Sequence, residues 1–268
     1  MLITIRASIF DPKQTHIKLR NTNNMNANKI KTVHTSRTIM YAELEKVMDF
    51  GMEGDKYIES LGNNVTGKKS NSGVNKTANY LKQLYSFDLD NNLFVAFKYF
   101  WKLADSAEKP LLAFIYAINN DDLLAESIDV VRKTQVGEKA AIEFFEDEIE
   151  KYHPKKYSPN TRKSLAQNIA SSWKQAGFIQ GKVKNIRTQP DISYRVACFA
   201  FLLSYIKGER GEFLFKGIGV KALCLPDQKL RDLALESAKR DLMQYQYAGN
   251  VTSIGFTNLL SKAGIDAN

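Results

Sequence analysis

The chain has 268 residues, of which 44% are hydrophobic and 25% charged, and this composition is typical of a folded protein and excludes a disordered one. Its longest uncharged runs, residues 111–120 and 196–206, are about half of the roughly 20 residues that a membrane-spanning helix needs, so they predict buried helices and no membrane contact. The opening residues show no secretory signal pattern. Because Cys198 and Cys224 lie in apolar surroundings, we expect reduced thiols and a cytoplasmic location.

The formal net charge of +9 is distributed unevenly along the chain. Three stretches contain no Asp or Glu, and they hold half of the 38 basic residues: 12–42 with six, 60–87 with four and 151–190 with nine. Residues 88–150 hold fourteen acidic residues and six basic ones. Because DNA attracts Lys and Arg through the release of condensed counterions, these acid-free stretches favour a nucleic-acid partner.

The first part of the chain predicts an N-terminal arm and a helical unit. Residues 1–33 form the arm, with a short strand near residues 2–10 and an Asn-rich loop at 21–28. Residues 34–90 read as a helix-turn-helix unit, because apolar residues recur at steps of three and four. We expect its helices at 36–51, 55–61 and 72–86.

Residues 91–152 predict a helical core, with helices at 91–104, 110–119, 121–133 and 138–152. The aromatic side chains at the start of this region favour burial over a ligand cage. They are Phe94, Phe97, Tyr99, Phe100 and Trp101. The acidic run at 144–152 reads as a solvated helix face.

Residues 153–268 predict a winged-helix-like unit followed by C-terminal helices. Ser158 is a suitable N-cap, Pro159 suits the first turn, and Gly177 suits a left-handed C-cap, so a helix is expected over 158–177. A hairpin with strands at 178–179 and 182–184 would follow as the wing. Further on we expect helices at 192–207, 226–243 and 256–262, and a strand within 211–225. The whole chain is therefore predicted to be mainly α, with tandem helix-turn-helix or winged-helix units around a helical core.

The candidate DNA-binding residues follow from these helices. Lysines suit phosphates, Asn and Gln suit adenine edges in the major groove, and the wing would contact the flanking backbone. From the helix at 158–177 and its wing the candidates are Asn160, Arg162, Lys163, Gln167, Ser171, Lys174, Lys182, Lys184 and Arg187. From the helix at 72–86 they are Asn75, Lys76, Asn79 and Lys82.

The residue types of known catalytic and metal sites lack their usual spacing in this sequence. His16, His34 and His153 each stand alone, and no CxxC, HExxH, GxSxG or GxxxxGK[ST] motif occurs. We therefore expect no enzymatic activity, no catalytic residue, no metal, no cofactor and no small-molecule substrate.

Other interpretations remain open from the residues alone. The lysines could simply keep a solvated helix soluble. RNA would be favoured by exposed stacking aromatics, for which Tyr245 and Tyr247 are candidates. Alternatively, the acidic residues 138–150 could dock onto a basic partner protein or onto another copy of the chain.

Three segments carry a family resemblance: NVTGKKSNSGVNKTANYLKQL (64–84), LLAFIYAINNDDLLAESIDVV (111–131) and YSPNTRKSLAQNIASSWKQAGFI (157–179). Over about residues 34–187 the chain resembles the BrxA family, small proteins encoded with BREX bacteriophage-defence systems. The resemblance implies an all-helical body with winged-helix-like elements, double-stranded DNA binding without catalysis, and work beside other BREX components such as a methyltransferase and an ATPase. A transcriptional regulator of the same architecture is the alternative. Residues 1–33 and those after 190 are not clearly matched.

Overall fold

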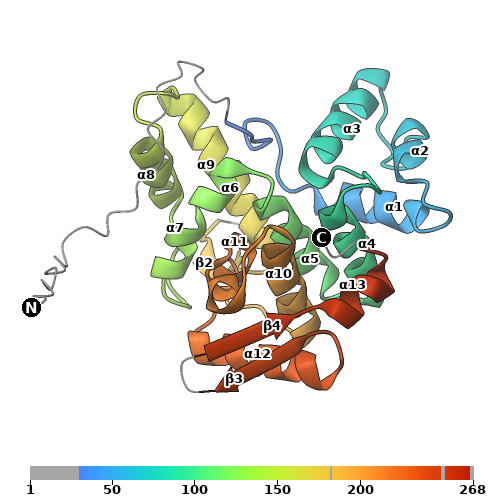
Figure 1. Cartoon of the computed structure of the whole chain (residues 1–268). Coiled ribbons are helices and arrows are strands. Elements are labelled where there is room, and N and C mark those ends of the chain that lie inside the picture. The colour runs from blue at the N-terminus through green and yellow to red at the C-terminus, as the bar shows by residue number, and fades with distance from the viewer. Residues whose placement is uncertain (1–29, 182, 249–250, 266–268) are drawn as a thin grey trace, which may run out of the picture.

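The structure is a computed structural model that describes residues 30–181, 183–248 and 251–265. It is mainly helical, with two small antiparallel hairpins, which confirms the predicted fold class at that level (Figure 1). Among the described residues, no helix combines the length and the apolar character that crossing a membrane requires. The strand expected near 2–10 and the loop at 21–28 lie outside the described residues.

A run of helices precedes both hairpins in the described chain. These helices are α1 (Tyr41–Gly51), α2 (Tyr57–Gly62), α3 (Asn71–Tyr85), α4 (Asn92–Leu103), α5 (Lys109–Ile118), α6 (Asp122–Glu126), α7 (Ile128–Lys133), α8 (Ile142–Tyr152) and α9 (Pro159–Gln175). Then come β1 (Ile179–Gln180), β2 (Ile186–Arg187), α10 (Tyr194–Ile206), the 3₁₀ helix η1 (Gly211–Lys216), α11 (Ile218–Lys221), α12 (Asp227–Lys239), β3 (Gln244–Ala248), β4 (Val251–Gly255) and α13 (Thr257–Ala263).

The core is built around α5 and α10, the two uncharged runs. Residues 111–118 of α5 and 196–204 of α10 are all buried, as their lack of charge predicts. The aromatic residues of α4 join them: the ring of Phe97 lies 4.8 Å from that of Tyr116 and 5.9 Å from that of Phe199. The predicted burial of this aromatic cluster is confirmed, except that Tyr99 is only half-buried.

Helix α1 begins at Tyr41, five residues later than expected. Residues 31–40 instead run without regular helix, and Met40 has the left-handed backbone angle φ 56°. The backbone N–H groups of Lys31, Val33 and Ile39 donate to side chains of residues that are distant in sequence, so these groups are not available for a helix of their own. The predicted helix at 121–133 is likewise divided at Ser127, whose hydroxyl donates to the Leu124 carbonyl and accepts from Trp173.

The first hairpin differs from its prediction. Strand β1 pairs with β2, whereas Val183 and Lys184 belong to neither strand, so the predicted second strand is wrong at these two residues; Lys182 lies outside the described residues. Gly181 and Asn185 both have positive φ, which makes a longer loop, and Val183 at its tip is 84% exposed. Strand β2 also bonds to the chain before α8, where Lys139 pairs with Ile186.

The C-terminal region corrects a second strand prediction. Residues 211–225 form η1 and α11, because Gly217 lets this segment lie directly on Ser204 of α10: a Cβ at Gly217 would be 1.9 Å from the Ser204 hydroxyl oxygen. The hairpin of β3 and β4, which the sequence did not predict, packs beside η1 and α12. One cluster of buried apolar residues runs from Val33 to Ile265, and α8 packs on α9 across the predicted boundary at 152/153.

Candidate nucleic-acid interface

Helix α9 has the ends that its sequence predicts. The Ser158 hydroxyl accepts a hydrogen bond from the backbone N–H of Thr161, Pro159 occupies the first turn, and Gly177 beyond the helix has φ 82°. The apolar side of α9 is fully buried through Leu165, Ala166, Ile169, Ala170 and Trp173. The helix is therefore fixed on the core with its opposite side turned outward.

The outward side of α9 carries the predicted polar stripe. Asn160, Lys163 and Gln167 are exposed, and Ser171 and Lys174 are half-buried. Since these residues recur at steps of three and four, they lie on one face. Lys163 and Lys174 form no ion pair with another described residue, so both ammonium groups are available to an anion.

Residues 31–41 lie between α9 and α3, as the dark blue segment in Figure 1 shows, and they form hydrogen bonds with both helices. On the α9 side, the Asn168 amide donates to the His34 carbonyl at 2.8 Å, and the Gln175 amide donates to the Thr38 hydroxyl at 2.8 Å. On the α3 side, the Gln83 amide and the Tyr85 hydroxyl donate to backbone carbonyls of the segment. Parts of the three acid-free stretches are therefore in direct contact.

A buried polar cluster holds the segment in place. The two imidazole nitrogens of His34 lie 2.9 Å from a carboxylate oxygen of Asp121 and 2.8 Å from the hydroxyl oxygen of Ser172. Asp121 also accepts from the backbone N–H groups of Val33 and Leu124. Burial alone would raise the pKa of Asp121, but the charge and hydrogen bond of His34 and these N–H groups outweigh it and lower the pKa.

Asp121, His34 and Ser172 are connected in the same order as the residues of a catalytic triad, but all three side chains are buried. His34 and Ser172 are completely buried and Asp121 is 2% exposed, so no substrate can reach the hydroxyl. The Ser172 hydroxyl oxygen also accepts from the Ile39 N–H. The cluster therefore joins α6, α9 and the segment before α1, and it has the character of a structural junction.

The α3 candidates lie beside a groove. Asn75, Lys76, Asn79 and Lys82 are all exposed, as their role requires. Three of them line a groove of about 510 Å³ between α2 and α3, together with Ile58, Leu61, Gly62, Val74 and Ala78. Near the segment, the guanidinium of Arg37 lies over the Tyr80 ring, 5.2 Å from its centroid. Arg37 thus places a cation of the segment against α3.

Two of the predicted contacts are corrected. Arg187 is only 3% exposed, and its guanidinium donates to the backbone carbonyls of Val131 and Thr188, so it supports the hairpin from inside and cannot reach a phosphate. Arg162 pairs with Glu150 of α8, and the Lys155 N–H together with Arg162 lowers the pKa of that carboxyl. Its charge is already compensated.

Of the two lysines predicted for the wing, the structure describes one. Lys184 is exposed in the hairpin loop and forms no ion pair with another described residue. Lys182 lies outside the described residues. The available cations of the candidate interface are therefore Lys76, Lys82, Lys163, Lys174 and Lys184.

The tyrosines considered for RNA stacking and the histidine of the basic stretch 151–190 have other contacts. Tyr245 is half-buried, and the ring of Tyr247, 54% exposed, carries the guanidinium of Arg231 at 4.7 Å from its centroid. His153 lies 2.8 Å from Glu126. Within residues 30–181, 183–248 and 251–265, no group of three or more His, Cys, Asp or Glu could hold a metal ion.

The residues that join this surface, His34, Asp121, Asn168 and Ser172, were not found from the sequence. His34 is 87 residues from Asp121 and 138 from Ser172, so no local spacing signals the cluster.

Comparison of the chain with protein-family models, with curated proteins and with solved structures finds no match.

Proposed function

We propose that this chain binds double-stranded DNA without catalysing a reaction, through the exposed faces of α9 and α3 and the segment between them. The observation that carries the proposal is the contact between the three acid-free stretches, because it joins the two helices that carry the unpaired lysines through one segment. Neutralising several phosphates together is what gives a DNA-binding protein its affinity.

The order of elements around α9 supports a winged-helix mode of binding. Helices α6 and α7 come first, the strand contact at Lys139 second, then α8 and α9, and finally the β1–β2 hairpin. In a helix-turn-helix protein the second helix of the pair enters the major groove, and α9 occupies that position. Asn160 and Gln167 would then face base edges, and Lys163 and Lys174 would face phosphates.

The biological setting that we propose is bacteriophage defence, as an accessory protein beside larger BREX components. The resemblance of residues 34–187 to the BrxA family suggests this setting. A transcriptional regulator with the same architecture is the second candidate. A footprint of the full chain on the DNA upstream of its own gene separates the two: a sharp protected site favours the regulator, and weak sequence preference favours the accessory protein.

The decisive experiment measures DNA affinity as a function of salt. Changing Lys163, Lys174 and Lys184 together to Ala should weaken binding to a 30-base-pair duplex at least tenfold and reduce the slope of log K against log salt by roughly 3, since each lost phosphate contact removes roughly 0.9. The matched control changes three exposed lysines of α11 and α12, namely Lys221, Lys229 and Lys239. Equal effects of the two triple variants, or no binding by the unaltered chain at low salt, would contradict the proposal.

A further inference from the structure

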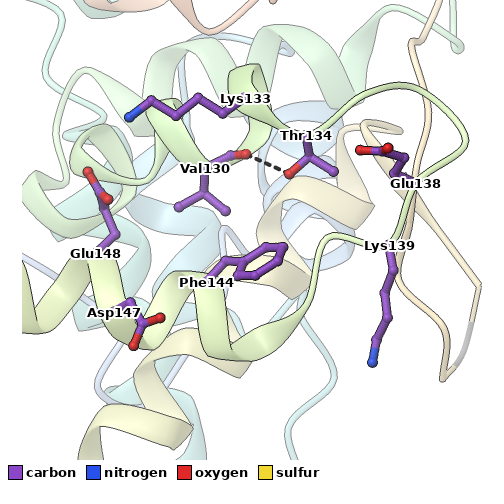
Figure 2. A pocket seen from close by; sticks show the side chains of 8 residues that line it. All are labelled: Val130, Lys133, Thr134, Glu138, Lys139, Phe144, Asp147 and Glu148. Carbon is purple, nitrogen blue, oxygen red and sulfur yellow. Dashed lines mark hydrogen bonds between the residues drawn. The ribbon is translucent and has the colours of Figure 1, made fainter.

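A groove lies between α7, the connection to α8, and α8 itself, as Figure 2 shows. Its volume is about 700 Å³, which is enough for a few side chains of a bound molecule. The residues that line it are Val130, Lys133, Thr134, Glu138, Lys139, Phe144, Asp147 and Glu148.

The centre of the groove is apolar. The ring of Phe144 projects into it from α8 and is 50% exposed, and Val130 forms part of the opposite wall. The Thr134 hydroxyl donates to the Val130 carbonyl, so its hydrogen is not available to a ligand. On the connection beside the groove, Val136 is 64% exposed. An aromatic ring half open to water between apolar neighbours is a suitable anchor for an apolar side chain of a partner.

Carboxylates lie on both sides of this apolar centre. Figure 2 shows Asp147 and Glu148 on one side of Phe144 and Glu138 on the other. Glu148 pairs with Lys151 at 2.6 Å, whereas Asp147 has no ion pair with another residue in the described part of the chain. The cation Lys133 already contacts Asp129 at 3.5 Å. Lys139 also lines the groove without an ion pair in the described part of the chain, and its ammonium points away from Glu138 in Figure 2. With three carboxylates and two ammonium groups, the lining has a formal net charge of −1, in a chain whose net charge is +9.

The groove lies on a different side of α8 from α9. Glu146 and Glu150 point toward Arg162 of α9, and residues 144, 147 and 148 project from the other side of the helix. The three carboxylates of the lining outnumber its two lysines, so the groove favours a cation over a phosphate. A basic peptide, by contrast, would find both charge and an apolar contact.

We propose that this groove binds a basic segment of a partner protein, with an apolar side chain against Phe144 and a Lys or Arg on either side of it, near Glu138 and near Asp147. The proposal does not depend on DNA binding, because the groove and α9 use different residues. The contact area is small, so the complex is a transient one with an affinity on the order of micromolar.

The test uses a phage-displayed library of random dodecamer peptides, selected against the immobilised full chain. We expect enrichment of peptides in which Lys or Arg flank an apolar residue. A synthetic fluorescein-labelled peptide of the enriched sequence should bind with at least tenfold lower affinity to the Asp147→Lys and Phe144→Ser variants, measured by fluorescence anisotropy. Glu53→Lys, an exposed charge reversal away from the groove, should bind as the unaltered chain does.

The outcomes separate the proposal from its alternatives. Failure to enrich any sequence, an acidic consensus, or equal binding by Asp147→Lys would overturn it. Concentration-dependent dimerisation in light scattering that Asp147→Lys abolishes would assign the groove to a second copy of the chain and also overturn it. The peptide assay contains no DNA, so a failure of DNA binding does not affect this result. If Phe144→Ser lowers the melting temperature and thus destabilises the fold, the peptide affinity of Asp147→Lys still tests the proposal.

Discussion

The imidazole Nε2 of His34 lies 2.8 Å from the hydroxyl oxygen of Ser172, and both side chains are completely buried. This contact fixes the segment before α1 to α9, and Asp121 extends it to the start of α6. Because the same segment also bonds to α3, the cluster sets the position of α3 relative to α9. The junction therefore determines whether the two basic faces form one surface.

Replacing Asp121 should reveal how much this junction contributes to stability. Asp121→Asn leaves His34 beside a neutral amide and weakens the hydrogen bonds from Val33 and Leu124. Leaving buried hydrogen-bonding groups poorly satisfied costs about 1–3 kcal/mol in the free energy of unfolding. Urea denaturation at neutral pH measures this loss. An unchanged unfolding midpoint would mean that the cluster does not stabilise the fold.

The same variant should differ from the unaltered chain in its response to acid. Because the pKa of Asp121 is lowered in the folded protein, its contribution is present above the ordinary value of 3.8 and is lost as the pH falls through the folded pKa. The difference in unfolding free energy between the chain and Asp121→Asn should therefore shrink as the pH falls below about 3.8. A difference that grows in acid would contradict this sign.

Arg187 should affect stability and leave DNA binding unchanged. Its guanidinium donates to carbonyls on both sides of the hairpin base, so Arg187→Met leaves these groups without partners and should cost about 2–3 kcal/mol. The salt dependence of DNA binding by the folded variant should equal that of the unaltered chain. A slope reduced by roughly 1 would instead assign Arg187 to a phosphate.

The two basic faces can be tested against each other. If one DNA molecule contacts both, Lys76→Ala with Lys82→Ala should reduce the salt slope by roughly 2, as should Lys163→Ala with Lys174→Ala. Combining the four changes should add the two losses in binding free energy, because the pairs lie on separate helices. Fluorescence anisotropy between about 50 and 200 mM salt gives the slopes. No effect of the α3 pair would restrict the interface to α9.

Gly51 of α1 and Gly62 of α2 allow a matched test of how closely α1 and α2 pack. A Cβ at Gly51 would lie 2.1 Å from the Tyr57 ring, which is buried, so Gly51→Ala should destabilise the fold by about 1–3 kcal/mol. A Cβ at Gly62 would meet nothing within 4 Å, so Gly62→Ala should be neutral or stabilising by up to about 1 kcal/mol. Thermal unfolding compares the two variants directly.

The local parts of the fold could be predicted from the residues. Ser158, Pro159 and Gly177 define α9 because a helix cap acts within a few residues of itself. The stripe from Asn160 to Lys174 follows from helical periodicity, and the burial of α5 and α10 follows from their lack of charge. The strand expected within 211–225 was wrong because the close approach of Gly217 to Ser204 is a contact between distant residues.

The amino-acid sequence by itself determined most of the helices, the caps of α9 and the separation of basic from acidic stretches, since each of these depends on neighbours along the chain. Only the tertiary structure decided that Arg187 turns inward, that Arg162 is paired with α8, and that residues 31–41 join α3 to α9. Those outcomes depend on hydrogen bonds between residues as many as 138 positions apart, and such pairs leave no periodic pattern in the sequence.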